Sequence, residues 1–214
     1  MKSDEQNGID DFFPPGLFCY RVHRELVLVG GALTDGGSVV EWARALLNMK
    51  DEESFKTCLE QVAHEYEKSC TEAFAGVGTA SSASNSITMV PFLSGERSIG
   101  FRGGAKGCIS GLTRETTSTD IMHACLESVV LRLGCVLQLI KETCYLHSVE
   151  GTTSSRSILV ASGNALERNT LWRQMLADCS SMDVIMDNDS REGSSRGAAV
   201  LMAASLNQVS IFRV

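Results

Sequence analysis

One long run of apolar residues at helical spacing constrains the fold more than any other feature of this sequence. It covers about six or seven turns and consists of Ile121, Cys125, Leu126, Val129, Val130, Leu133, Val136, Leu137, Ile140 and Cys144. The Thr- and Ser-rich residues 116–119 precede it and can cap the first amides of a helix. An apolar stripe this wide predicts a core helix that packs on a sheet.

The C-terminal part of the sequence alternates between strand and helix patterns. SILVASG is an apolar run of strand length, and it precedes a predicted helix over about Asn169–Cys179. MDVIMD then predicts a second strand, and REGSSRGAAVLMAASL predicts a small-residue helix. This order forms a βαβα unit, in which the two strands are parallel and helices cover them. The expected fold class is therefore α/β.

The N-terminal third predicts two strands followed by two helices. LFCYRV and ELVLVGGAL are short apolar runs that predict adjacent strands or one bent hairpin. A turn at Gly36-Gly37 leads into a helix that we expect to carry Trp42, Leu46 and Leu47 on one side. Residues 51–74 open with acidic side chains and continue as a second amphipathic helix.

A glycine-rich segment connects these helices to the long apolar run. It extends from Ile87 to Thr113 and predicts a short strand at its start, followed by irregular but ordered structure, because apolar residues keep recurring in it. Within it, Glu96 and Arg97 are adjacent, and we interpret them as a buried or loop-fixing ion pair.

Charge and hydropathy limit the classes of partner. The 214 residues carry a net charge of -7, and the pI is about 5.1, which disfavours nucleic acid because phosphate neutralisation needs clustered Lys and Arg. We expect no membrane span, since no run of about 18 apolar residues occurs, and a cytoplasmic location. Residues 1–15 are expected to form a disordered leader, and 207–214 a C-terminal tail.

Eight cysteines are present without a secretory signal, so we interpret them as reduced and mostly buried thiols. His123 and Cys125, and Cys144 and His147, have spacings that a metal site could use. Each pair lacks a second close pair, and we therefore expect no metal site.

The junction after SILVASG is the candidate ligand site, because ligands of α/β units gather at the carboxyl ends of strands. Gly163 permits close backbone approach, and the amides of Asn164 and Asn169 suit a nucleobase edge. From spacing alone, an ordinary turn with Asn169 as a helix N-cap is the favoured alternative. No Walker A motif, G-x-G-x-x-G motif or recognisable catalytic set occurs in the sequence.

Five collinear motifs resemble the carboxy-terminal domain of FGGY carbohydrate kinases over residues 16–206. They are PFLSGER, AKGCISGLT, TDIMHACLES, ASGNALERNTLWRQMLAD and EGSSRGAAVLMAA. The resemblance implies a ribonuclease-H-like domain of the actin, Hsp70 and hexokinase superfamily. In that superfamily, two such domains enclose ATP and a sugar in the cleft between them, and this chain corresponds to the second.

The resemblance also implies ligands and their contacts. ATP with Mg²⁺ would be the cofactor, and a sugar or sugar-acid hydroxyl would accept the phosphoryl group. Gly163, Asn164 and Asn169 would lie against adenine. Gly37 and Glu41 would lie near the ribose and phosphates.

The resemblance implies that three family features lie in parts of the kinase that this chain does not match: the Asp-x-Gly-Thr/Ser hairpin of the first domain, the aspartate that acts as the base, and the Gly-Thr-Ser hairpin that opens the second domain. We therefore expect no catalytic residue here, inactivity of the chain alone, and a sheet that is incomplete at its N-terminal strands. Such a sheet would offer an edge to a partner chain. The alternative is a truncated, non-catalytic module that binds a nucleotide or a partner.

Overall fold

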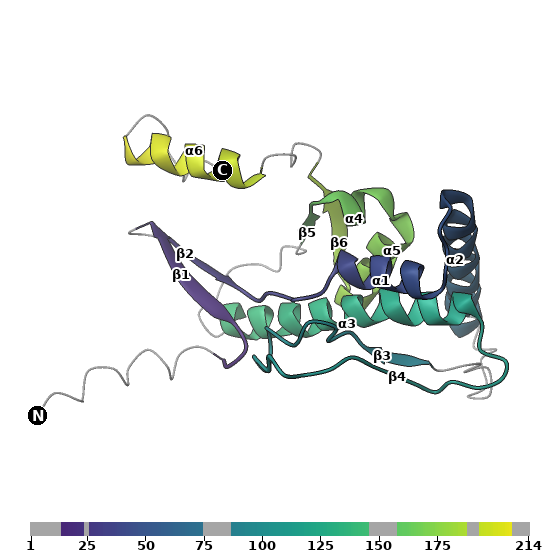
Figure 1. The fold of residues 1–214 in the computed structure, drawn as a ribbon. Coiled ribbons are helices and arrows are strands. Elements are labelled where there is room, and N and C mark those ends of the chain that lie inside the picture. The colour runs from purple at the N-terminus through teal and green to yellow at the C-terminus, as the bar shows by residue number, and fades with distance from the viewer. Residues whose placement is uncertain (1–13, 24–25, 75–86, 146–157, 188–192, 207–214) are drawn as a thin grey trace, which may run out of the picture. The chain divides into compact units, whose positions relative to one another are not determined.

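The computed structural model describes residues 14–23, 26–74, 87–145, 158–187 and 193–206 (Figure 1). The chain divides into two compact units. The first unit comprises Met1–Leu17 and Gly30–Thr152, and the second comprises Phe18–Val29 and Thr153–Val214. Residues 1–13 of the expected leader, the expected tail and His147 lie outside the described residues.

The first unit is organised around a single long helix, α3 (Ser118–Tyr145). Helices α1 (Gly37–Leu46) and α2 (Glu52–Phe74) pack on α3, as does strand β3 (Thr88–Val90). Strand β3 pairs antiparallel with β4 (Cys108–Ser110), with Met89 opposite Ile109. The predicted core helix and its packing on a sheet are thereby confirmed, whereas β4 was not expected.

Helix α3 begins where its sequence supplies a reciprocal cap. The carboxylate of Asp120 accepts a hydrogen bond from the backbone N–H of Thr117 at 2.7 Å, and the Thr117 hydroxyl accepts one from the N–H of Asp120 at 3.2 Å. This is the capping-box arrangement with Asp in the acidic position. The Thr-rich start therefore caps the helix, as predicted.

The apolar stripe of α3 forms the centre of the core. Met122, Cys125 and Leu126 are fully buried, and Val129 and Val130 are nearly so. Residues Ser118–Thr143 have a mean hydropathy of 1.5 and are long and apolar enough to cross a bilayer. Core helices of folded domains have the same length and hydropathy, and α1, α2 and β3 pack on this helix.

Helix α1 turns a different face to the core from the one that we expected. Its buried residues are Val39, Val40 and Ala43, whereas Leu46 is 57% exposed. Small and β-branched side chains allow α1 to approach α3 closely, and this packing overrides the position of the larger apolar residues. The expected face of Trp42, Leu46 and Leu47 is therefore wrong.

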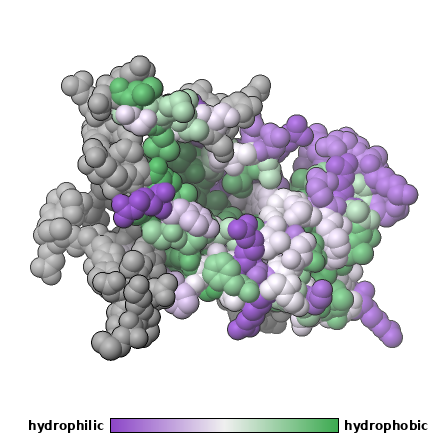
Figure 2. Space-filling view, turned by 60° about the vertical axis from the view of Figure 1, so that its left-hand side comes forward, coloured by the Kyte–Doolittle hydropathy of each residue, from purple (hydrophilic) through white to green (hydrophobic). Residues whose placement is uncertain are grey.

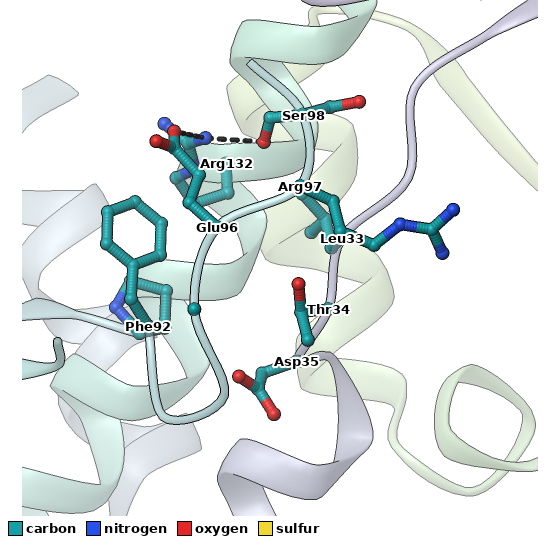
Figure 3. Close-up of a pocket in the computed structure, with 10 residues that line it drawn as sticks. Leu33, Thr34, Asp35, Phe92, Glu96, Arg97, Ser98 and Arg132 are labelled. Carbon is teal, nitrogen blue, oxygen red and sulfur yellow. Dashed lines mark hydrogen bonds and ion pairs between the residues drawn. The ribbon is translucent and has the colours of Figure 1, made fainter. Parts of the chain in front are cut away.

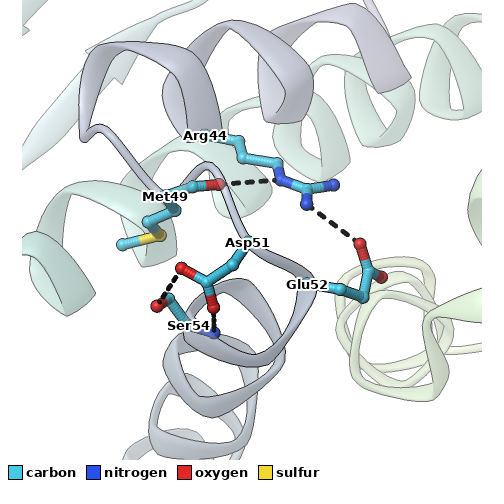
Figure 4. Close-up of polar contacts among 5 residues, drawn as sticks. All are labelled: Arg44, Met49, Asp51, Glu52 and Ser54. Carbon is cyan, nitrogen blue, oxygen red and sulfur yellow. Dashed lines mark hydrogen bonds and ion pairs between the residues drawn. The ribbon is translucent and has the colours of Figure 1, made fainter.

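The junction of α1 and α2 is fixed by polar contacts (Figure 4). Arg44 donates to the carbonyl of Met49 at 3.0 Å and pairs with Glu52 at 2.9 Å. Asp51 precedes α2 and accepts hydrogen bonds from both the N–H and the hydroxyl of Ser54, each at 2.7 Å. These bonds lower the pKa of Asp51, the side-chain bond to Ser54 being the largest cause.

The second unit contains the predicted strand and helix alternation. Strand β5 (Ile158–Ala161) pairs parallel with β6 (Asp183–Met186), and Val160 lies opposite Ile185. Helix α5 (Thr170–Ser180) lies between them in sequence and packs on β6, and α6 (Gly193–Ser205) follows. The βαβα order and the parallel pairing are confirmed.

Two further elements complete the second unit. A short helix, α4 (Asn164–Arg168), precedes α5 and was not expected. The extended backbone of Asn169 separates the two helices. The predicted N-terminal strands are β1 (Phe18–His23) and β2 (Leu26–Gly30), which pair with each other.

The cysteines are less buried than expected. Of the seven whose side chains are described, all have free thiols, but only Cys58 and Cys125 are buried, and four are exposed: Cys19, Cys108, Cys135 and Cys179. Burial raises the pKa of Cys125 to about 11.

Exposed hydrophobic residues lie among hydrophilic ones on the face shown in Figure 2. We conclude that apolar character alone does not identify the core residues of this chain.

A pair of leucine substitutions on α3 tests the assignment of its buried face. Leu126→Ala removes a fully buried side chain and should lower the free energy of unfolding by about 2–5 kcal/mol. Leu131→Ala changes a side chain that is 52% exposed and should cost less than about 0.5 kcal/mol. Urea denaturation followed by circular dichroism measures both, and equal costs would contradict the assignment.

The cap of α2 predicts a pH effect. The folded-state pKa of Asp51 is lowered from 3.8, so its stabilisation is present above about pH 4 and is lost as the pH falls through the lowered value. Carboxyl NMR should show Asp51 titrating below 3.8, and Ser54→Ala should return the midpoint towards 3.8. Thr57→Ala, an exposed change on the same helix, should leave the Asp51 midpoint unchanged.

Candidate functional site

The turn between β5 and α4 presents an open backbone. Gly163 has φ of 101° and ψ of 150°, a conformation that side-chain-bearing residues rarely adopt. Among the described atoms, none lies within 4 Å of where a Cβ at Gly163 would be. Ser162 and Asn164 on either side are exposed. A flat ligand therefore has access to the main chain at this point.

Asn169 acts as the N-cap of α5. Its side-chain oxygen accepts a hydrogen bond from the N–H of Trp172 at 3.0 Å, and its own backbone is extended. The capping role that spacing favoured is confirmed. Arg173 donates to the carbonyls of Leu166 and Glu167 at 2.7 and 2.9 Å, which fixes the end of α4 against α5.

Gly37 and Glu41, the other two candidate residues, lie on α1 in the first unit. Gly36 is the N-cap of α1, and no side chain among the described residues caps this end. The first turn carries no acidic residue, and Glu41 is exposed. Unpaired N–H groups at a helix start attract anions. The five candidates thus fall into two groups, one in each unit.

A buried carboxylate just before α1 was missed in the sequence. Asp35 is only 7% exposed. It accepts hydrogen bonds from the Ser94 N–H at 2.8 Å and from the hydroxyls of Ser94 and Ser38, each at 3.2 Å. Asp35 and Ser38 are only three residues apart at the start of α1, so their side-chain contact has a local signal, but nothing local indicates Ser94. Asp35 therefore holds the start of α1 against a loop 59 residues away.

A second polar cluster ties the same loop to α3 (Figure 3). Arg132 donates to the carboxylate of Glu96 and to the carbonyl of Ser98, both at 2.6 Å. Its guanidinium also lies 5.0 Å from the centre of the Phe92 ring. Arg97 is exposed and points away from Glu96. The expected Glu96–Arg97 pair is therefore wrong, because α3 supplies a half-buried arginine, Arg132, which lies 36 residues away in the sequence.

The hollow between these clusters is too small for a substrate. Its volume is about 10 Å³, and its polar lining includes Asp35, Glu96 and Arg132. This is room for a single water molecule. The Nε of Arg132 is buried and has no partner among the described residues, so a water there would satisfy it. We conclude that the two clusters shape the loop rather than bind a nucleotide.

The described part of the chain brings together no group of three or more His, Cys, Asp or Glu side chains that could hold a metal ion. The carboxylate of Asp35 accepts a hydrogen bond from Ser94, and that of Glu96 accepts one from Arg132, so both have donors in place.

Comparison with known families identifies the domain. The family model of the FGGY carbohydrate kinases, C-terminal domain, matches residues 15–206. The chain belongs to this family. The resemblance carried by the five motifs is therefore confirmed.

Two curated relatives of this FGGY domain are gluconokinases. The protein of Bacillus licheniformis is 24% identical over 198 residues, and that of Bacillus subtilis (strain 168) is 23% identical over 196. In each case the alignment covers 92% of this chain but 35% of the relative. The chain thus spans about a third of the length of these proteins.

Solved structures show the same fold. The gluconate kinase from Lactobacillus acidophilus superposes with a TM-score of 0.67 at 22% identity, covering 92% of this chain and 35% of that one. Plasmodium falciparum glycerol kinase with ADP gives 0.62 at 18% identity, covering 91% and 34%. The FGGY C-terminal domain has an actin- and hexokinase-like fold, and the mixed helix and sheet of this chain agrees with it.

A double-mutant cycle tests the contact between the loop and α3. Removing either partner of a buried ion pair lowers the free energy of unfolding by about 3–5 kcal/mol. We expect a loss at the lower end of this range, because the Arg132 side chain is 20% exposed. Glu96→Gln combined with Arg132→Met should cost less than the two single changes together. Chemical denaturation of the four proteins gives the coupling. Strict additivity would contradict a direct pair, and Arg97→Met is the neutral control.

Proposed function

We propose that this domain is the nucleotide-binding half of an ATP-dependent carbohydrate kinase. The observation that carries the proposal is the family match over residues 15–206. The whole kinase would transfer a phosphoryl group from ATP to a hydroxyl of a sugar or sugar acid. That reaction requires groups on both sides of the transferred phosphoryl, so we propose that a first kinase domain completes the cleft.

The open turn at Gly163 supports a role in binding adenine. A nucleobase needs a flat approach and a few amide groups at its edge, and Gly163 and Asn164 are exposed where such a ring could lie. In this proposal Asn169 acts mainly through its cap, since its oxygen is bonded to the Trp172 N–H. It would hold α5, and hence the turn, in position.

The start of α1 supports a role near the ribose and phosphates. Its N–H groups and Gly37 would face negative charge, and Glu41, one turn later, would bond the ribose hydroxyls. Asp35 and Ser94 would keep this helix end in place through the bonds described above.

We propose Mg²⁺ as the accompanying ion, and it would neutralise charge on the phosphates. The described residues offer no cluster for it. Mg²⁺ commonly binds through substrate phosphates, and the nucleotide would therefore carry it.

The remaining aspects of the proposal concern setting and substrate. A cytoplasmic location fits the relatives, and gluconate is suggested by the names of the two gluconokinases. Two-stranded sheets such as β5–β6 leave strand edges that can pair with further strands, and we propose that a partner chain or the first domain adds there.

Titration calorimetry with ATP and Mg²⁺ tests nucleotide binding by the chain. We expect saturable binding, which Asn164→Ala should weaken about tenfold through loss of a hydrogen bond. Glu167→Ala, an exposed change on the same short helix α4, should bind as the wild type does. No heat at millimolar ATP, or equal effects of the two changes, would contradict the proposed adenine site.

A coupled kinase assay tests the need for the first domain. The chain alone should give no turnover with gluconate, xylulose, ribulose or glycerol, because half of the transition-state contacts would be missing. Turnover by the purified chain would show that it contains a complete catalytic site.

A further inference from the structure

The loop of residues 97–106, here called the basic loop, has a charge opposite to that of the chain. It contains Arg97, Arg102 and Lys106 and no acidic residue. All three cations are exposed. Without them, the chain keeps 16 of its 19 basic residues against 26 acidic ones. The basic loop is thus a local cationic surface on an acidic molecule.

An aromatic side chain is held outward in the middle of the basic loop. Phe101 is 57% exposed. Its φ of 51° lies in the left-handed region, which residues with a side chain adopt uncommonly. Strain of this kind persists where the surroundings impose it, and it clusters at functional positions. Phe and Arg are both enriched in the cores of protein interfaces, and here an exposed phenyl ring lies in sequence between two arginines.

The surroundings that impose this conformation are part of the structure. The backbone N–H of Phe101 donates to the carbonyl of Arg97 at 2.6 Å, and the backbone N–H of Glu96 donates to the carbonyl of Arg102 at 3.0 Å. Gly95 approaches Gly103 so closely that a Cβ would lie 2.5 Å from its carbonyl oxygen. The base of the loop is also anchored by the Glu96–Arg132 pair. Binding by such a preorganised loop loses little conformational entropy.

A complementary surface exists on the same molecule. Helix α2 carries six glutamates and two lysines. Glu53, Glu60 and Glu67 recur every seven residues on one side of the helix, and all three are exposed. Lys56 lies on the same side and pairs with Glu60 at 3.7 Å, so the side keeps a net negative charge with one cation in it. We call the three glutamates the acidic stripe. Successive members are about 10 Å apart along the helix axis, which is a spacing that the cations of a ten-residue loop can match.

We propose that the basic loop of one chain binds the acidic stripe of a second copy. Two basic loops repel each other, so the contact joins two different surfaces, and it closes as a two-fold dimer only where each chain's basic loop meets the other chain's acidic stripe at once. Otherwise each chain joins the next one head to tail. Contacts of this head-to-tail kind extend into open chains of molecules unless the rotation closes a ring. The association depends on charge and is weakened by salt.

Sedimentation velocity measures this self-association directly. At about 20 mM NaCl the average mass should rise with protein concentration above that of the monomer, and at about 500 mM NaCl it should fall back towards that of the monomer. Arg97→Glu with Arg102→Glu, and separately Phe101→Ser, should each weaken association about tenfold or more. A monomer at every concentration in low salt would overturn the proposal.

A charge exchange identifies the two surfaces. Glu60→Lys with Glu67→Lys should abolish association in the same way as the reversed loop. An equimolar mixture of the two variants should associate again, because each surface finds an opposite charge on the other variant. Failure of the mixture to associate would overturn the assignment to α2, and general stickiness of exposed apolar residues would not produce this recovery.

Two controls separate the proposal from folding and from nucleotide binding. Met202→Ser changes an apolar side chain on α6 that is 67% exposed, and it should leave association unchanged. Circular dichroism should give the same helix content for all variants. The loop variants should also bind ATP as the wild type does, so a failure of nucleotide binding leaves the self-association result interpretable.

Discussion

The packing of one face of α3 is the constraint on which the first unit depends. The helix buries Met122, Cys125 and Leu126 against the elements around it. It also supplies Arg132, which fixes the loop at Glu96 and Ser98. A single helix therefore organises both the apolar core and the polar clusters. A change in its rotation would expose the stripe and separate the ion pair at the same time.

The sequence predicts most elements because their signals are local. Helical periodicity defines α2 and α3, the cap at Thr117 defines where α3 begins, and the apolar runs define the parallel pair β5 and β6. Where the decisive partner is distant, the sequence does not indicate it. The buried face of α1 depends on its fit to α3. Glu96 pairs with Arg132 on α3 and not with Arg97, its neighbour in the chain.

The same distinction applies to the candidate site. Asn169 as a cap was predictable, because a cap needs only the next three residues. The open backbone at Gly163 was predictable from glycine at a strand end. The role of Asp35 was not, since its partner Ser94 lies far away in sequence. The proposed contacts of Gly37, Glu41, Gly163 and Asn164 with a nucleotide come from the family resemblance and remain a prediction.

The burial of Cys125 affects the order in which the thiols of this domain react with oxidants. Only the thiolate reacts readily, and with a pKa of about 11 about one molecule in ten thousand carries it at pH 7. The exposed thiols at Cys19, Cys108, Cys135 and Cys179 have no such protection by burial. We therefore expect oxidation of the domain to begin at its surface, where mixed disulfides can form and be reduced again, and the buried thiols of Cys58 and Cys125 to react more slowly while the domain is folded.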